Sequence, residues 1–438
     1  MSGRKYLQLN FNNIPATGLV SHARGNPVLT ATIGRQDAEL DLSSIRVSGK
    51  IDMYATSARA RPVAGGVGSL LRASHKLGIY GAIDQIVFRN AETQQVVEHI
   101  RHYGRFMSSF LPTMASSQDM AGHLSESALI SDNYDAFTTG VVRNTRASYF
   151  SVPLPSGLTL GGGKIPLDKF PLEIEIHLAP DSQFFFSSSG VTTSIADAFY
   201  ELSDLEISCE VDNEVKSPDT GVMTFNSITS YFSTLESTNS IINYRLGLSN
   251  VLGAFVNFVP SAFINNLGQD GYLTYMPSVK TTDVGGAGVG GGALANLLKI
   301  SFLRNGERFP KHFENDTVYD ATNKTPVADS EVIKSFMSSI IPESIHARTS
   351  VSPLTSNRNF TVTNSAVSGY RNMPCAGATY GVGVLYDMLD SQGVDFSTAQ
   401  FSIQMENELE DGNPVSAYLF VKSKVVVAYS PQGVQIVS

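Results

Sequence analysis

The alternation of apolar and polar positions indicates β-strands along most of the chain. Residues 172–178 alternate leucine and isoleucine with glutamate and histidine, the period of a strand with one buried and one solvent-facing side. Residues 204–212 alternate in the same way and place Cys209 on the buried side. Residues 40–53 carry an apolar side that is interrupted once at 43–44, which predicts a β-bulge there.

Similar strand patterns continue through both halves of the chain. They occupy residues 78–88, 241–263, 297–303, 399–405 and 418–427. A short helix is predicted at 193–200. The best linker is the sequence Ser-Pro-Asp-Thr-Gly at 217–221, because a charged strand precedes it and a new strand pattern follows. These patterns predict an all-β chain of two units, residues 1–217 and 218–438, each with about eight strands and one or two short helices.

One short sequence occurs twice. Phe-Met-Ser-Ser stands at 106–109 and again at 336–339, 230 positions later. The apolar residues around each copy follow the i, i+3, i+4, i+7, i+8 spacing of a helix with one apolar face. They are Tyr103, Phe106, Met107, Phe110 and Leu111 in the first copy, and Ile333, Phe336, Met337, Ile340 and Ile341 in the second. We expect both faces to be buried, so that truncating Phe106 or Phe336 to alanine costs about 3–5 kcal/mol.

The proline that follows each copy, at 112 and 342, is expected to end the helix because proline lacks the N–H that would continue it.

Other segments repeat in the same order. Residues 86–92 resemble 300–307, and residues 172–176 resemble 401–405. A glycine-rich run precedes the first of these segments in each half, and Tyr149 corresponds to Tyr380. The offsets drift only between 215 and 231, so we interpret the chain as one unit that has been duplicated.

Composition and length agree with two strand-rich domains. The 438 residues are too many for one ordinary core, and 42% of them are apolar. The net charge of −9 gives no whole-chain signature of nucleic-acid binding. Two cysteines are too few for a disulfide framework, which favours reducing conditions during folding. No secretory signal is visible at 1–13, and the most apolar window, 251–264, is too short to span a bilayer. We expect the protein to be made in soluble form.

Three stretches contain residue types that also occur in chemical sites. The glycine-rich run at 286–291 lacks the lysine of a phosphate-binding loop and precedes a strand pattern, which favours a flexible loop. His99 and His102 would share one side of a helix, as metal ligands often do, but no further ligand stands at a matching spacing. The acidic cluster at 406–411 has no calcium-loop spacing and is interpreted as a solvated rim.

Two further stretches bear on binding. Residues 55–105 are rich in arginine, and a solvated or subunit-facing patch is favoured over an anionic partner such as lipid or nucleic acid. The aromatic run Phe184–186 is interpreted as core or subunit interface. The sequence therefore predicts a chain that is not an enzyme, with no catalytic, cofactor-binding or metal-binding residues.

As a whole, the chain resembles the double jelly-roll major capsid proteins of icosahedral DNA viruses. This group includes adenovirus hexons and the capsid proteins of virophages, Polinton-like viruses and membrane-containing phages. The features that carry the resemblance are the duplication, the Phe-Met-Ser-Ser helix in each half, the run at 166–174 and the strand at 205–211. The resemblance implies two tandem eight-stranded jelly-roll β-sandwiches with short helices inserted.

The resemblance also implies a structural role in the virion. Three chains would form a homotrimer with a pseudo-hexagonal outline, and these capsomers would tile an icosahedral shell. The implied partners are neighbouring capsomers, penton and minor capsid proteins, and either an internal membrane or the genome on the inner face. The glycine- and serine-rich stretches would form tower or interface loops, at 60–75, 111–130, 276–292, 310–330 and 350–375.

Two other functions stay open at this point. The first is a β-sandwich host-attachment or carbohydrate-binding spike protein, against which the absence of tryptophan argues. The second is an enzyme on a bicupin-like scaffold, which needs a repeated histidine and glutamate motif that the chain lacks.

Overall fold

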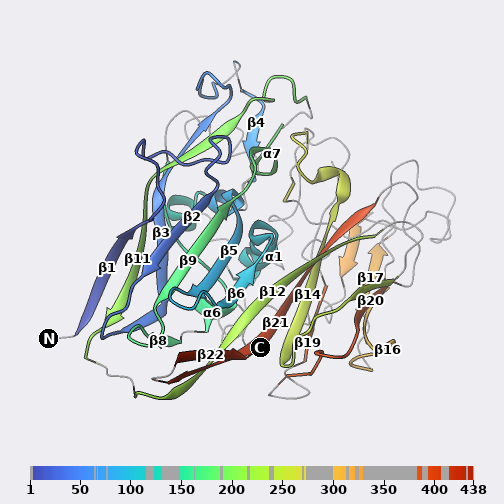
Figure 1. Ribbon diagram of the computed structural model, residues 1–438. Coiled ribbons are helices and arrows are strands. Elements are labelled where there is room, and N and C mark those ends of the chain that lie inside the picture. Colours follow the sequence, from blue (N-terminus) through green and yellow to red (C-terminus); the bar gives the residue numbers. More distant parts are fainter. Residues whose placement is uncertain are drawn as a thin grey trace.

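A computed structural model shows two β-sandwiches side by side (Figure 1). It describes the chain except for residues 1–2, 64–65, 67, 75–76, 115–122, 131–147, 162, 188–190, 215–217, 236–240, 269–270, 273–298, 312–314, 321–324, 329–338, 340–381, 387–392, 406–413, 431–432 and 438. The second copy of the repeated helix, the long glycine-rich run, the acidic cluster and Tyr380 therefore lie outside the described residues, apart from Ser339.

The first sandwich is built from two four-stranded layers with short additions. One layer has the order β1-β11-β3-β7 with β8 added to β3, and the other has the order β2-β9-β5-β6. A small sheet pairs β10 with β4. The strands are β1 (Arg4–Asn10), β2 (Val28–Ile33), β3 (Glu39–Tyr54), β4 (Leu71–Ala73), β5 (Ile83–Asn90), β6 (Val96–Ile100), β7 (Ser148–Pro153), β8 (Lys164–Pro166), β9 (Leu172–Leu178), β10 (Phe185–Ser187) and β11 (Phe199–Asp212).

The second sandwich repeats this arrangement. Its layers have the orders β12-β21-β14-β19, with β22 added to β21, and β13-β20-β15-β17-β18, with β16 added to β15. The strands are β12 (Gly221–Leu235), β13 (Ile241–Tyr244), β14 (Val251–Pro260), β15 (Lys299–Arg304), β16 (Glu307–Arg308), β17 (Asn315–Asp320), β18 (Thr325–Ala328), β19 (Val382–Leu385), β20 (Phe401–Met405), β21 (Val415–Ser430) and β22 (Gly433–Val437).

The strand order identifies each sandwich as a jelly roll. Of the eight principal strands in either half, one layer holds the first, eighth, third and sixth along the chain, and the other holds the second, seventh, fourth and fifth. The predicted fold, two tandem eight-stranded jelly rolls, is confirmed.

The register of the strands repeats as well as their order. In the first half Ile86 of β5 faces Ile176 of β9, and in the second half Ile300 of β15 faces Met405 of β20. Two residues along, Phe88 faces Ile174 just as Phe302 faces Ile403. These are the residues that the sequence repeat had matched, so the repeat reflects equivalent positions in two copies of one fold.

Several predicted strands are confirmed in detail. β9 alternates buried and half-buried side chains along its whole length, and Cys209 of β11 is buried. The β-bulge predicted at 43–44 is present, because the pairing of β11 with β3 shifts register between Arg46 and Asp41. The extra residues of the bulge shift the alternation, so the side chains of β3 that face outward have odd residue numbers before the bulge and even residue numbers after it.

Three local predictions were wrong. The strand expected over 78–88 begins only at Ile83, because Gly78–Ala82 forms a 3-10 helix (η1) with a positive φ at Gly78. The helix expected over 193–200 is a turn that leads into β11. Helix α1 (Tyr103–Met114) does not end at Pro112. Proline removes only one hydrogen bond from the last turn, and the two residues after it are still helical.

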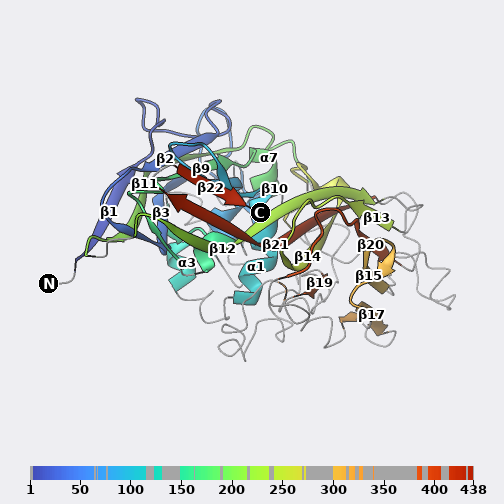
Figure 2. The same cartoon turned by 60° about the horizontal axis from the view of Figure 1, so that its bottom comes forward.

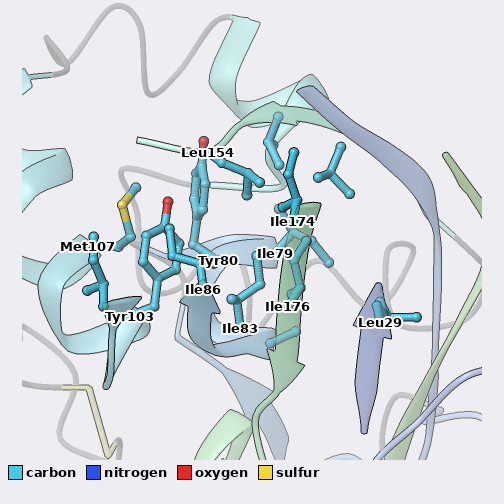
Figure 3. Close-up of a cluster of buried hydrophobic side chains, with 14 of the residues drawn as sticks. Leu29, Ile79, Tyr80, Ile83, Ile86, Tyr103, Met107, Leu154, Ile174 and Ile176 are labelled. Carbon is cyan, nitrogen blue, oxygen red and sulfur yellow. The ribbon is translucent and has the colours of Figure 1, made fainter. Parts of the chain in front are cut away.

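The other helices for which the described residues give bounds are short, and three of them lie around the first sandwich. They are α3 (His123–Ser127), α6 (Gly157–Leu160) and α7 (Asp181–Phe184), and a 3-10 helix, η2 (Ser261–Phe263), follows β14. The first core is continuous from the jelly roll to α1, and Figure 3 shows Tyr103 and Met107 of this helix beside Tyr80 and Ile86. The run Phe184–186 is buried, so its interpretation as core is confirmed.

Candidate functional site: the seam between the two jelly rolls

In the sheet β12-β21-β14-β19, β14 and the first half of β21 are buried on both faces, and both lie beside α1 (Figure 2). On β14, Val256 and Phe258 belong to the core of the second jelly roll, whereas Phe255 and Val259 belong to the core that extends from the first. Side chains of a strand alternate between the two faces of the sheet, so one face fills its own sandwich and the other packs against the first half. We call this contact surface the seam; it joins α1, β6 and α6 to β12, β14 and β21.

Helix α1 forms the apolar centre of the seam. Its stripe of Tyr103, Phe106, Met107, Phe110 and Leu111 is buried, as predicted. The ring centroid of Phe106 lies 5.2 Å from that of Phe110, 6.2 Å from Phe255 on β14 and 5.7 Å from Phe420 on β21. A helix that belongs to the first jelly roll therefore packs against the second jelly roll as well.

Asn257 of β14 adds polar contacts to this helix. It is completely buried, and its Nδ2 donates hydrogen bonds to the carbonyl oxygen of Arg105 at 3.0 Å and to Oγ of Ser109 at 2.9 Å. Ser109 is the second serine of the repeated sequence. Its counterpart Ser339 is also helical and buried. Buried donors need such partners, so these bonds fix the position of α1 on β14.

Glu98 of β6 is a buried carboxylate at the edge of the seam. Its Oε1 accepts hydrogen bonds from the backbone N–H groups of Gly157 at 2.9 Å and Ile228 at 2.6 Å, and its Oε2 accepts one from Leu158 at 3.0 Å. Gly157 and Leu158 begin α6, whereas Ile228 lies on β12 of the second half. Burial raises the pKa of Glu98 to about 7, while the hydrogen bonds from Leu158, Ser156, Ile228 and Gly157 oppose that rise.

The edge strands β6 and β12 meet through side chains. Ser227 Oγ donates to the carbonyl oxygen of Val97 at 3.4 Å, and the N–H of Arg101 donates to Ser230 Oγ at 2.8 Å. A Cβ atom on Gly157 would lie 2.7 Å from the carbonyl oxygen of Asn226, so this close approach requires glycine. Edge strands expose unpaired backbone groups, and here each jelly roll covers an edge of the other.

Arg105 and Tyr272 close the other end of the seam. Arg105 is 1% exposed, and its guanidinium carbon lies 5.1 Å from the ring centroids of both Tyr272 and Tyr418. The Tyr272 hydroxyl donates to the carbonyl oxygen of Gly81 at 2.6 Å, and its ring lies so close to Gly104 that no Cβ would fit there. These cation–π contacts hold two second-half tyrosines against the first half.

The two histidines considered as metal ligands do not form a site. His99 lies on β6 with its Nε2 3.0 Å from Oε1 of Gln85, and burial lowers its pKa to about 4. His102 lies in the turn before α1, and its ring packs against Phe232 and Tyr418. In the part of the chain that the structure describes, no group of three or more histidine, cysteine or acidic residues could hold a metal ion.

Several arginines of the arginine-rich stretch 55–105 that the structure describes are paired or buried and do not face solvent freely. Arg59 pairs with Glu201, Arg61 with Asp52, and Arg89 with two glutamates of β9, while Arg105 is buried in the seam. Internal ion pairs therefore account for much of the local positive charge that the sequence shows.

The polar residues of the seam were missed by sequence reasoning. The sequence signal for Glu98 is a carboxylate within a mostly apolar strand, because Glu98 follows two valines and precedes His99 and Ile100 in β6. Asn257 interrupts the apolar run of β14 in the same way. A polar residue within a strand buried on both faces needs a partner, and that partner cannot be identified without the fold.

Among the described helices, none has the length and apolar character needed to cross a membrane.

Comparison with known proteins finds the same fold in viral capsids. No protein-family model and no curated protein sequence matches the chain. The PBCV-1 virus capsid structure matches with a TM-score of 0.53 and 12% identity over 99% of this chain and 96% of that one. The Sputnik virophage structure matches with a TM-score of 0.52 and 10% identity over 99% and 88%.

The Faustovirus major capsid protein matches with a TM-score of 0.50 and 9% identity, over 98% of this chain and 91% of that one. Each of these three matches covers nearly the whole of this chain, so the likeness includes both sandwiches and their order. The chain therefore has the double jelly-roll fold that is found in the major capsid proteins of icosahedral viruses.

Proposed function

We propose that this chain is a major capsid protein that trimerises into pseudo-hexagonal capsomers and tiles an icosahedral virus shell. The observation that carries the proposal is the duplication, in which two jelly rolls with the same strand order and register are fixed side by side by a buried seam. Three such pairs supply six similar units around a ring. The proposed division into jelly rolls is 1–217 and 218–438.

A structural role fits the residues of the seam. Glu98, Asn257 and Arg105 are buried, and each contacts backbone or aromatic groups of the other half. Such contacts hold two domains in a fixed relation, which a shell subunit needs. The structures named above are capsid proteins or capsids, so they give no support to the alternative of a host-attachment or carbohydrate-binding protein.

The proposed partners are further copies of the chain in a homotrimer, neighbouring capsomers, and penton and minor capsid proteins. The inner face would meet either a membrane or the genome. The protein would be made in soluble form inside the host cell and would end in the virion.

Light scattering coupled to size-exclusion chromatography tests the proposal. We expect a mass of about 141 kDa, three times the 47.1 kDa of one chain, and particles with hexagonal outlines in negative-stain images. A monomer at every concentration tested would overturn the proposed function.

A further inference from the structure

A cavity of about 630 Å³ lies at the end of the first jelly roll that is far from both termini of the chain. Figure 1 shows α7 at this end, whereas the N and C labels lie at the opposite end. The segments that follow β1, β3 and β9 line the cavity together with the start of β11, and Leu267 of the second half completes it. The N–H of Ser187 donates to the carbonyl oxygen of Leu267 at 2.6 Å, so the two halves meet beside the cavity. We call this space the arginine cavity.

Two arginines of the arginine cavity are held by one buried carboxylate. Glu201 of β11 has a side chain that is only 1% exposed. Its Oε1 accepts a hydrogen bond from Nε of Arg24 at 2.6 Å, and its Oε2 pairs with Arg59. A buried carboxylate needs such partners, so Glu201 fixes the place of both guanidinium groups.

Both guanidinium groups keep capacity for a further partner. The side chains of Arg24 and Arg59 are 37% and 44% exposed. Among the residues that the structure describes, none bonds Nη1 or Nη2 of Arg24. One carboxylate neutralises only one of the two cations, so a positive charge is left over at this part of the lining. A planar guanidinium pairs best with a carboxylate or a phosphate, to which it donates two parallel hydrogen bonds.

A carboxylate without a cation lies in the same lining. Asp181 of α7 accepts a hydrogen bond from the N–H of Tyr200 through Oδ1 at 3.1 Å. No described residue forms an ion pair with Asp181. Burial raises the pKa of Asp181 to about 6, although the Tyr200 N–H and the nearby His22 oppose this rise. Asp181 therefore offers acceptor capacity to a ligand that donates hydrogen bonds.

The rest of the lining provides hydroxyl groups and a phenyl ring. Ser57 and Ser182 carry the hydroxyls, and Phe199 carries the ring in a chain that has no tryptophan. The ring centroid of Phe199 lies 5.1 Å from that of Tyr54, and this contact fixes its position. An aromatic side chain of this kind can pack against the C–H groups of a sugar ring.

These groups together select one class of ligand. A cation would meet two guanidinium groups, and an inorganic anion would leave Asp181 unpaired and most of the space empty. An apolar molecule would bury charged groups without giving them partners. A molecule with one carboxylate and several hydroxyls can pair with Arg24 and Arg59 and still donate hydrogen bonds to Asp181.

We propose that the arginine cavity binds an acidic saccharide, whose carboxylate pairs with Arg24 and Arg59 and whose hydroxyls donate to Asp181. The Phe199 ring then packs against the apolar face of the sugar. Glu201 is a positioning residue, because it holds both arginines and is itself too buried to contact the ligand. This site goes beyond the proposed capsid role and does not need the trimer, because a single chain supplies the whole lining.

Saturation-transfer NMR on sugar protons tests the proposal with the full-length protein, since this method suits large proteins. The probe is methyl β-D-glucuronide. Methyl β-D-glucoside is its matched control, because it differs only in carrying CH₂OH in place of the carboxylate. We expect the glucuronide to bind about tenfold more tightly than the glucoside, because one charge-assisted pair separates them.

Two variants with matched controls locate the site. Arg24→Gln should weaken glucuronide binding about tenfold. Its control Arg35→Gln, which removes another arginine paired with a glutamate, should leave binding unchanged. Ala196→Trp fills the cavity from an exposed position, keeps both ion pairs and should abolish binding, whereas Gln95→Trp in the turn between β5 and β6 should not. Circular dichroism checks that each variant folds, and Ala196→Trp decides the matter if Arg24→Gln does not fold.

Several outcomes would overturn the proposal. They are equal binding of the two glycosides, binding of neither, and glucuronide binding that survives Ala196→Trp. Acetate or glycine that displaces the glucuronide at an equal concentration would also overturn it, because a simple carboxylate or an amino acid would then be the preferred ligand. None of these results bears on the trimer, which light scattering tests separately.

Discussion

The two equivalent sheets, β1-β11-β3-β7 and β12-β21-β14-β19, differ in how many of their faces are buried. The first has one core face and one face with exposed tyrosines, while the second has its own core on one side and α1 on the other. The sequence reflects this difference: β3 alternates, whereas β14 is an almost continuous apolar run broken by Asn257. A strand that is apolar on both sides thus marks the place where one jelly roll meets its twin.

Removing the helix side chain that spans the two halves should have the largest effect. Phe106→Ala leaves a cavity between Phe110, Phe255 and Phe420, and we expect the free energy of unfolding to fall by about 3–5 kcal/mol. Denaturant titration measures this loss in the free energy of unfolding. The control Phe232→Ala removes a ring that is 48% exposed and should cost about 1 kcal/mol or less. Equal losses in the two variants would mean that α1 does not hold the seam. Phe336, the equivalent residue of the second copy, lies outside the described residues, and its expected cost stays a prediction.

The stability of the seam should depend on pH through Glu98. Its pKa is raised from 4.5 to about 7, so the folded state binds this proton more tightly than the unfolded chain does. Stability from this group is therefore fully present below pH 4.5 and is lost as the pH rises through 7. As the pH falls from 8 to 4.5, we expect the free energy of unfolding of the wild type to rise by up to about 3 kcal/mol relative to that of Glu98→Gln.

Unfolding titrations of both proteins across that pH range measure the difference between them. Glu92→Gln, which changes an exposed carboxylate, is the control and should follow the wild type. A constant difference between wild type and Glu98→Gln would show that Glu98 does not titrate in this window.

Asn257 tests the polar part of the same contact. Asn257→Ala removes the hydrogen bonds to Arg105 and Ser109, and a loss of about 1–3 kcal/mol is expected. Asn10→Ala changes an exposed asparagine on the equivalent sheet and should lie within about 0.5 kcal/mol of wild type. Thermal unfolding at one pH compares the two, and similar shifts would mean that the two sheets do not differ as described.

The smallest effect on the single chain is expected at Tyr149 of β7, on the face of the first sheet that points away from the core. Tyr149→Ala should change the unfolding free energy of the dissociated chain by about 0.5 kcal/mol or less, because this side chain is 69% exposed. Phe420→Ala on the equivalent sheet should cost about 3–5 kcal/mol. Measured at dilutions where the protein is monomeric, comparable losses at the two positions would remove the contrast between the sheets.

Much of the fold followed from local pattern. The alternation of β9, the bulge in β3 and the apolar stripe of α1 could all be predicted because each depends on neighbours in the sequence. The 3-10 turn at Gly78–Ala82 could not, because its apolar residues do not distinguish a strand from a tight turn. The partners of Glu98 and Asn257 could not be predicted either, since they are 59 to 152 positions away in the chain.

The most direct measurement of the central claim is an electron cryo-microscopy map of the assembled protein. The account predicts three copies in a ring of six jelly rolls, with Phe106 of α1 packed against Phe255 and Phe420 within every copy. A map of single copies, or one in which the two jelly rolls of a copy do not meet through α1, would contradict it.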